Sequence, residues 1–131
     1  MDAARRVVLL EGGMGLLWVA LGALYVGLDG LGEAWWVVAG SLLAGVAAVY
    51  ADEHDVHGLD EWYRAAATVV GVVAWVTAVG IVVVLTELSV LTVVGGALAG
   101  LGAGIVCYRF VYGVVRPVPK ARLERAGGRS V

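Results

Sequence analysis

Four long apolar stretches make up most of the chain, at residues 7–28, 35–51, 65–85 and 90–115. A helix needs about 20 mostly apolar residues to cross the hydrocarbon layer of a membrane, and these stretches approach or exceed that length. The helices of a soluble protein would carry a polar face on every turn, which these stretches lack. Because backbone groups in lipid must bond within their own segment, we expect each stretch to be a transmembrane helix.

The second pair of stretches repeats the first. Trp18-Val19 in the first stretch corresponds to Trp75-Val76 in the third, and residues 37–45 of the second correspond to residues 93–101 of the fourth. Both copies start on the same side of the membrane, so a pseudo-twofold axis along the membrane normal should relate them. The sequence predicts an all-α fold, a four-helix transmembrane bundle made of two tandem parallel helical-hairpin repeats.

Basic residues predict the orientation of the bundle. The connections at 29–34 and 86–89 carry none, whereas both ends of the chain do. Since short cytoplasmic loops are enriched in Lys and Arg, we expect a multi-pass protein of the cell membrane with both termini in the cytoplasm. Residues 1–131 then form a single integral membrane domain, with repeat 1 at 5–51, repeat 2 at 60–115 and a cytoplasmic basic tail at 116–131.

Helix ends and chain processing add three expectations. Asp60 is a good N-cap residue for the third helix, and Pro117 and Pro119 should end the fourth. Arg5-Arg6 before an apolar run is also typical of a secretory signal. However, Glu11 interrupts that run and no clear cleavage site follows, so we expect a retained first helix.

Composition agrees with a membrane protein and excludes several classes. The chain is 61% hydrophobic with a mean hydropathy of +0.92, against about 45–50% apolar residues in soluble domains. A formal net charge of −2 gives no support to a nucleic-acid partner, which would leave a basic footprint. The single cysteine, Cys107, excludes an internal disulfide or a cysteine-rich metal site.

Small residues recur at four-residue spacing in the second and fourth helices. The two ladders are Gly40, Ala44 and Ala48, and Gly96, Gly100 and Gly104. Small residues at this spacing let helix backbones approach closely in lipid. We therefore expect the second and fourth helices to cross through these two ladders.

Large and charged residues share the faces that carry glycines. Trp18 and Trp75 lie near the middle of their helices, where they either fill gaps left by glycines or line a ligand site or pore; we expect packing. Glu11 and Arg109 are the clearly intramembrane charges, at similar depths on the cytoplasmic side. We expect them to pair, because an isolated charge in lipid is costly. The plainest role for such a pair is mutual neutralisation.

The middle connection gathers His54, Asp55 and His57 among further carboxylates. Imidazole and carboxylate groups are ligands for divalent metals, but a solvated acidic loop has the same composition. We expect the solvated loop and keep the metal site as the alternative.

Nothing in the sequence specifies a reaction. Each of Ser41, Ser89 and Ser130 lacks a nearby base in the sequence, and the spans contain no histidine. We expect no enzymatic activity and no cofactor. The favoured function is a non-catalytic, self-associating interaction or structural subunit. The alternative is a small oligomeric ion channel or transporter.

The expected partners follow from the same features. They are the lipid bilayer, further copies of the chain or a larger membrane complex, and anionic lipid at the C-terminal tail. That tail carries five basic residues against Glu124, and each basic residue near an anionic leaflet contributes about 1 kcal/mol.

Overall fold

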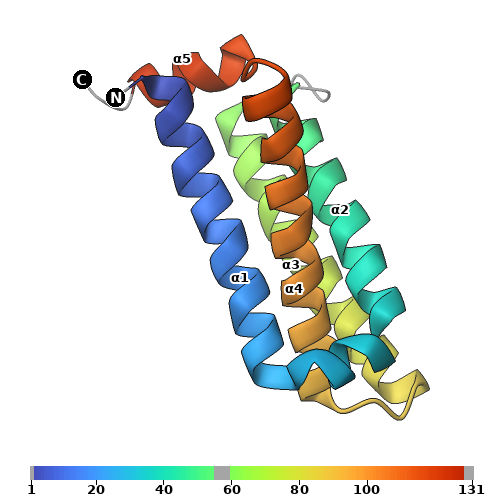
Figure 1. Ribbon diagram of the computed structural model, residues 1–131. Helices are drawn as coiled ribbons and strands as arrows, with labels where there is room; N and C mark the ends of the chain where they lie inside the picture. Colours follow the sequence, from blue (N-terminus) through green and yellow to red (C-terminus); the bar gives the residue numbers. More distant parts are fainter. Residues whose placement is uncertain (1, 55–59, 129–131) are drawn as a thin grey trace.

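The computed structural model of the protein describes residues 2–54 and 60–128, and every element in these ranges is a helix (Figure 1). This confirms the all-α prediction. Within these two ranges, four helices are long and apolar enough to cross a membrane. The elements in chain order are α1 (Ala3–Glu33), α2 (Trp35–Glu53), α3 (Glu61–Leu85), α4 (Val90–Arg109), the wide turn η1 (Phe110–Val115) and α5 (Lys120–Gly128).

Helix α4 is the centre of the fold. It packs along its length against α1 on one side and α2 on the other, while α1 and α2 scarcely touch each other. Glycines make this possible, because a Cβ added at Gly15 of α1 would stand 2.8 Å from the backbone oxygen of Gly102. Close backbone approach of this kind is the expected use of small residues between apolar helices.

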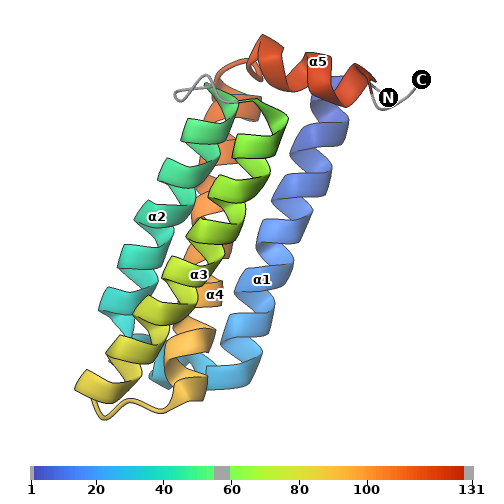
Figure 2. The same cartoon turned by 180° about the vertical axis from the view of Figure 1, so that it is seen from behind.

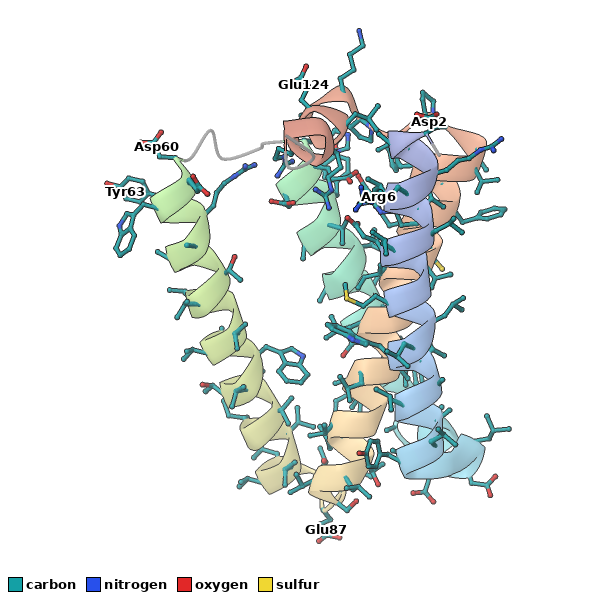
Figure 3. The ribbon with its side chains drawn as sticks, turned by 90° about the vertical axis from the view of Figure 1, so that its left-hand side faces the viewer. Asp2, Arg6, Asp60, Tyr63, Glu87 and Glu124 are labelled. Atoms are coloured by element: carbon teal, nitrogen blue, oxygen red, sulfur yellow. The ribbon has the colours of Figure 1, made fainter. Side chains whose placement is uncertain are left out.

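Helix α3 stands apart from the other three long helices. It leans away from them at its Asp60 end and converges on them at its Glu87 end (Figure 3), and seen from behind it lies in front of α4 (Figure 2). Near the converging end, the side chains of Trp75, Val79, Val82 and Val83 pack against a small core cluster from α2, α4 and the α1–α2 junction. None of the residues 61–85, all of them described, is buried.

The packing departs from the predicted twofold symmetry. A twofold relation between the hairpins would pair α2 with α3 as closely as α1 pairs with α4, but α2 and α3 make almost no backbone contact. The physical reason lies in the stripe that faces α4. Gly22 of α1 lies against the backbone of Gly95, whereas the corresponding residue of α3 is Val79, whose branched side chain keeps a neighbouring backbone away.

The connection at 29–34, predicted as a loop, is mostly helical. Gly27 takes φ 72° and breaks α1 there, a conformation that glycine adopts at little cost. The chain then resumes a short helical run, turns at the fully buried Ala34 and enters α2 (Figure 1).

The other helix ends also differ in detail from the predictions. Asp60 occupies the N-cap position of α3, but its side chain accepts no capping bond there. Ser89 does cap α4, because its Oγ accepts a hydrogen bond from Thr92 N at 3.1 Å. The α4 helix ends at Arg109, well before Pro117, and passes into η1, where Tyr112 and Gly113 leave helical geometry.

Candidate functional site: a buried charge cluster beside an apolar cleft

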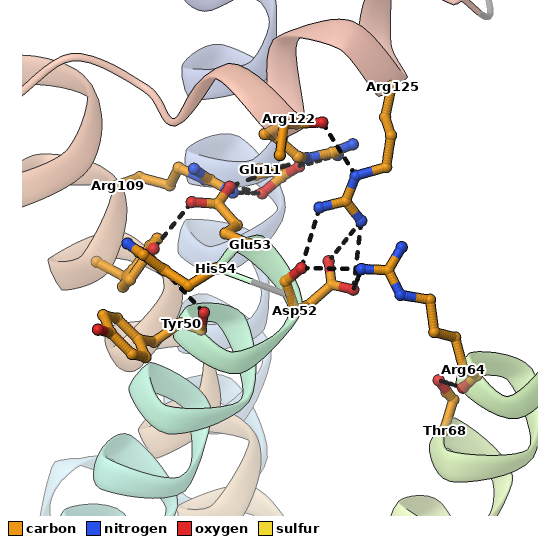
Figure 4. A network of polar contacts seen from close by, with 12 residues as sticks. Glu11, Tyr50, Asp52, Glu53, His54, Arg64, Thr68, Arg109, Arg122 and Arg125 are labelled. Carbon is orange, nitrogen blue, oxygen red and sulfur yellow. Dashed lines mark hydrogen bonds and ion pairs between the residues drawn. The ribbon is translucent and has the colours of Figure 1, made fainter. Parts of the chain in front are cut away.

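Four charged side chains from four helices meet at the end of the bundle that α5 covers (Figure 4). Arg109 Nε of α4 donates a hydrogen bond to Glu11 Oε2 of α1 at 2.8 Å, and Arg109 Nη2 also contacts Glu53 of α2. Arg122 Nε of α5 donates to the second oxygen of Glu11 at 3.1 Å. We call Glu11, Glu53, Arg109 and Arg122 the charge cluster.

The centre of the charge cluster is buried, its outer members Glu11 and Arg122 are 19% and 26% exposed, and its two carboxylates balance its two guanidinium groups. Glu53 is 1% exposed and Arg109 is 2% exposed, so both have lost most of their hydration. Burial of a charge is tolerated only with partners that replace its water. Tyr108 supplies a further one, since its hydroxyl donates to Glu53 Oε2 at 2.9 Å. Among the described residues, Nη1 of Arg109 has no hydrogen-bond partner.

The structure brings together the two residues that the sequence paired, Glu11 and Arg109, and adds two that it did not. Glu53 was assigned to the loop after the second helix, but α2 continues to Glu53 and carries its side chain inward. Arg122 was counted with the basic tail that was expected to bind anionic lipid. The signal that could have found Glu53 is helical periodicity, because it lies two turns after Val46 on the side of α2 that faces α4.

A row of aromatic rings lies beside the charge cluster. Tyr50 and His54 stack at 4.0 Å between ring centroids, His54 meets the edge of Tyr112 at 5.6 Å, and Tyr112 stacks on Tyr108 at 4.8 Å. The ring of His54 also bonds through Nδ1 to the carbonyl oxygen of Tyr50 at 3.0 Å. The row ties the end of α2 to η1.

The suggested metal ligands are only partly described. Asp55 and His57 lie outside the described residues, and His54 is engaged by Tyr50 and Tyr112. Within residues 2–54 and 60–128 there is no group of three or more His, Cys, Asp or Glu side chains that could hold a metal ion.

A second, more exposed ionic group lies at the same end. Arg125 Nη1 of α5 lies 3.4 Å from the Asp52 carboxylate, and Arg64 Nη2 of α3 lies 3.9 Å from it. Two of the arginines expected to face lipid, Arg122 and Arg125, are therefore used within the chain. Arg116 and Lys120 of the same tail remain exposed.

An apolar cleft of about 670 Å³ separates α3 from the other helices. Trp18 and Trp75 both line it, so the two tryptophans that were expected to act as packing residues also form the walls of a cavity. Trp75 is half-buried and contacts the core cluster as well. The remaining lining residues are Ala44, Ala48, Ala51, Asp52, Arg64, Ala67, Thr68, Gly71, Val72, Leu98 and Leu101.

The predicted ladder of small residues in α2 is wrong, because its two alanines face the cleft and not α4. Gly100 and Gly104 lie against the α2 backbone, as expected, and Gly96 lies against residues 34–38. Gly40, Ala44 and Ala48 do not face α4. An added Cβ at Gly40 meets nothing within 4 Å, and the two alanines are exposed to the cleft. The residues that meet the α4 glycines or backbone here are Ala34, which precedes α2, and Val37, Val38, Ser41, Leu42, Gly45 and Val46 of α2.

A family model described as "Domain of unknown function (DUF8097)" matches residues 31–122. The chain belongs to the DUF8097 family. The part of this DUF8097 protein that matches contains Glu53, Arg109 and Arg122 of the charge cluster, whereas Glu11 and Trp18 precede it. No match was found among curated proteins or among solved structures.

Proposed function

We propose that this DUF8097 protein is a multi-pass protein of the cell membrane that acts as a non-catalytic, self-associating interaction subunit. Four helices of sufficient length and apolarity support the membrane location. The placement of the ends supports the orientation. Residues 2–6, the start of α3 and α5 lie at one end of the bundle (Figure 1). That end carries the basic residues of the part of the chain that the structure describes, which favours a cytoplasmic position.

The observation that carries the proposal is the poor packing of α3 on its own chain. This helix contacts α4 only weakly and buries none of its residues. Its outer side is a row of exposed valines, including Val69, Val73 and Val76. A helix fixed at one end gains little from its own chain, so contacts with a second copy would hold it in place. Such contacts between membrane helices depend on close side-chain packing.

The charge cluster supports an organising role better than a catalytic one. Its carboxylates and guanidinium groups bind one another, and they connect α1, α2, α4 and α5 at one end of the bundle. Groups used in this way fix the relative position of helices. We therefore assign the charge cluster to assembly of the fold and the outer side of α3 to contact between copies.

Cysteine cross-linking in native membranes tests the proposal. In a Cys107→Ala background, Val73→Cys places a thiol on the outer side of α3, and Leu17→Cys places one on the exposed side of α1. A bifunctional thiol reagent should convert Val73→Cys into a covalent dimer and leave Leu17→Cys monomeric. Equal cross-linking of both, or of neither, would contradict an α3 interface. A single-chain mass for the wild-type protein in mild detergent would contradict self-association.

A further inference from the structure

We propose that the cleft between α3 and the other helices binds one hydrocarbon chain of an anionic phospholipid, with the phosphate at Arg64 and Arg125. The inference rests on the membrane location proposed above. Beyond the proposed function, the site has a ligand of defined chemical class and separate residues that bind its chain and its head.

The size and lining of the cleft fit a ligand site. A volume of about 670 Å³ lies within the roughly 300–1,000 Å³ of known small-molecule pockets, which are mainly apolar with a few polar groups. Among the lining residues, Thr68 already donates its hydroxyl to the carbonyl oxygen of Arg64 at 2.9 Å. The middle of the cleft thus offers few hydrogen-bonding groups to water.

The volume of the cleft also favours a hydrocarbon chain over a helix as the apolar occupant. A membrane-spanning helix is a cylinder about 10 Å wide and about 30 Å long, which corresponds to a volume on the order of 2,000 Å³. A helix of a second copy is therefore larger than the cleft and would have to move α3 to enter it. A flexible hydrocarbon chain does fit, and it is the material that surrounds a lateral opening in the hydrocarbon layer.

A second space shares a lining residue with the polar end of the cleft. A cavity of about 380 Å³ between α3 and α5 is lined by Arg64, Ala121, Glu124 and Arg125. Arg64 lines both spaces. An apolar cavity that adjoins a smaller cavity with two guanidinium groups matches the two parts of an amphiphile, its chain and its head.

Charge complementarity predicts that the lipid headgroup is anionic. Arg64 and Arg125 already hold one anion between them, the carboxylate of Asp52 (Figure 4). The contacts with the carboxylate are long, at 3.9 and 3.4 Å, and the Asp52 side chain is 58% exposed. Nη2 of Arg64 and Nη2 of Arg125 also donate to the Asp52 carbonyl oxygen, at 3.3 and 3.0 Å, and these bonds keep both guanidinium groups at the cavity. A phosphate accepts hydrogen bonds from arginine in a bidentate manner, so it can replace Asp52, whose carboxylate is free to turn to water. The Glu124 carboxylate lines the same cavity and repels an anion. The contacts of a phosphodiester with Arg64 and Arg125 must therefore be stronger than this repulsion.

Lipid retention by the full-length protein tests the site. Protein delipidated in detergent is mixed with phosphatidylglycerol or phosphatidylcholine carrying identical oleoyl chains, and adducts are counted by native mass spectrometry. We expect one phosphatidylglycerol per chain and at least several-fold weaker retention of phosphatidylcholine. Ala48→Phe fills the cleft and should lower retention of both lipids about tenfold. Ala47→Phe, an exposed position outside the cleft lining, should behave like wild type.

Two further variants separate chain from head and guard against misfolding. Gly71→Leu fills the cleft from α3, where an added Cβ meets nothing within 4 Å, and should also lower retention. Arg64→Gln with Arg125→Gln should retain a lipid but lose the preference for phosphatidylglycerol. Arg116→Gln with Lys120→Gln, an equal loss of charge at the same end, should keep that preference.

Three results would overturn the site. The first is unchanged retention in both Ala48→Phe and Gly71→Leu. The second is loss of the preference for phosphatidylglycerol in Arg116→Gln with Lys120→Gln, while Arg64→Gln with Arg125→Gln keeps it. That pattern would place the lipid on the outer surface of the tail. The third is a cleft occupied by a second copy, seen as dimers without lipid that Ala48→Phe and Gly71→Leu dissociate. Cross-linking at Val73 is scored independently, so failure of self-association is distinguishable from failure of the lipid site.

Discussion

Arg109 is held by carboxylates from two different helices. Glu11 and Glu53 both accept from its guanidinium group, and Glu53 is almost completely shielded from solvent. Breaking a buried pair is costly chiefly because the remaining charge loses its partner. The position of Glu53 therefore changes the expected effect of removing Arg109. Without the guanidinium group, two carboxylates lose a partner and face each other, instead of Glu11 alone losing its partner.

We predict that Arg109→Gln lowers the free energy of unfolding by about 3–5 kcal/mol, the usual result of leaving buried charge unpaired. Glu11→Gln should cost less, since Arg109 keeps Glu53 and Arg122 is half-exposed. Adding Glu11→Gln and then Glu53→Gln to Arg109→Gln should restore part of the loss at each step. Unfolding in detergent, followed by tryptophan fluorescence, measures the series. Strictly additive losses would show that these groups do not interact.

At the scale of helices, rows of small residues decide which faces touch. The α4 side of the contact with α2 follows the predicted ladder of Gly96, Gly100 and Gly104, whereas the α2 side uses a neighbouring row. Sequence could not distinguish the two rows of α2. Both contain small residues, and lipid gives apolar residues no reason to prefer one side of the helix over another.

Gly100 and Gly40 form a matched pair that tests this assignment. An alanine Cβ at position 100 would lie 2.7 Å from Ser41 Cβ and closer still to the Val38 carbonyl oxygen, whereas one at position 40 meets nothing within 4 Å. We predict that Gly100→Ala destabilises by about 1–3 kcal/mol, the usual cost of overpacking. Gly40→Ala should be neutral or gain up to about 1 kcal/mol from helix propensity.

Thermal unfolding of both variants under the same detergent conditions measures the difference. Equal melting temperatures for Gly100→Ala and Gly40→Ala would contradict close contact between α4 and α2 at Ser41.

At the scale of the whole molecule, charge is divided between the two ends. The far end carries Asp29, Glu33 and Glu87, and no basic residue lies there among the described residues. The end covered by α5 holds the charge cluster and the arginines of α3 and α5. This asymmetry is the basis of the proposed orientation, because lysine and arginine near short loops are retained in the cytoplasm.

Labelling from one side of intact cells checks the orientation. In a Cys107→Ala background, Glu87→Cys should react with a membrane-impermeant maleimide in intact cells, and Lys120→Cys should react only after permeabilisation. Both positions are exposed, so accessibility within the fold does not separate them. The reverse pattern would contradict the proposed topology.

The sequence by itself determined the helices and the meeting of Glu11 with Arg109. Length and apolarity suffice for helices when backbone groups must bond locally. For the pair, matched depth and the glycines at Gly15 and Gly102 place both charges on faces that approach each other. These are properties of single helices, and periodicity along the chain records them.

Only the tertiary structure decided how the helices are arranged. It placed α4 between α1 and α2 and left α3 apart, with the cleft between α3 and the other helices. It also brought Glu53 to Arg109 and Arg122 to Glu11. The repeat in the sequence favoured two equivalent hairpins, but Val79 stands where α1 has Gly22, and one branched side chain prevents the same close approach. Such contacts depend on the fit between surfaces of different helices, which the periodicity of any one helix does not specify.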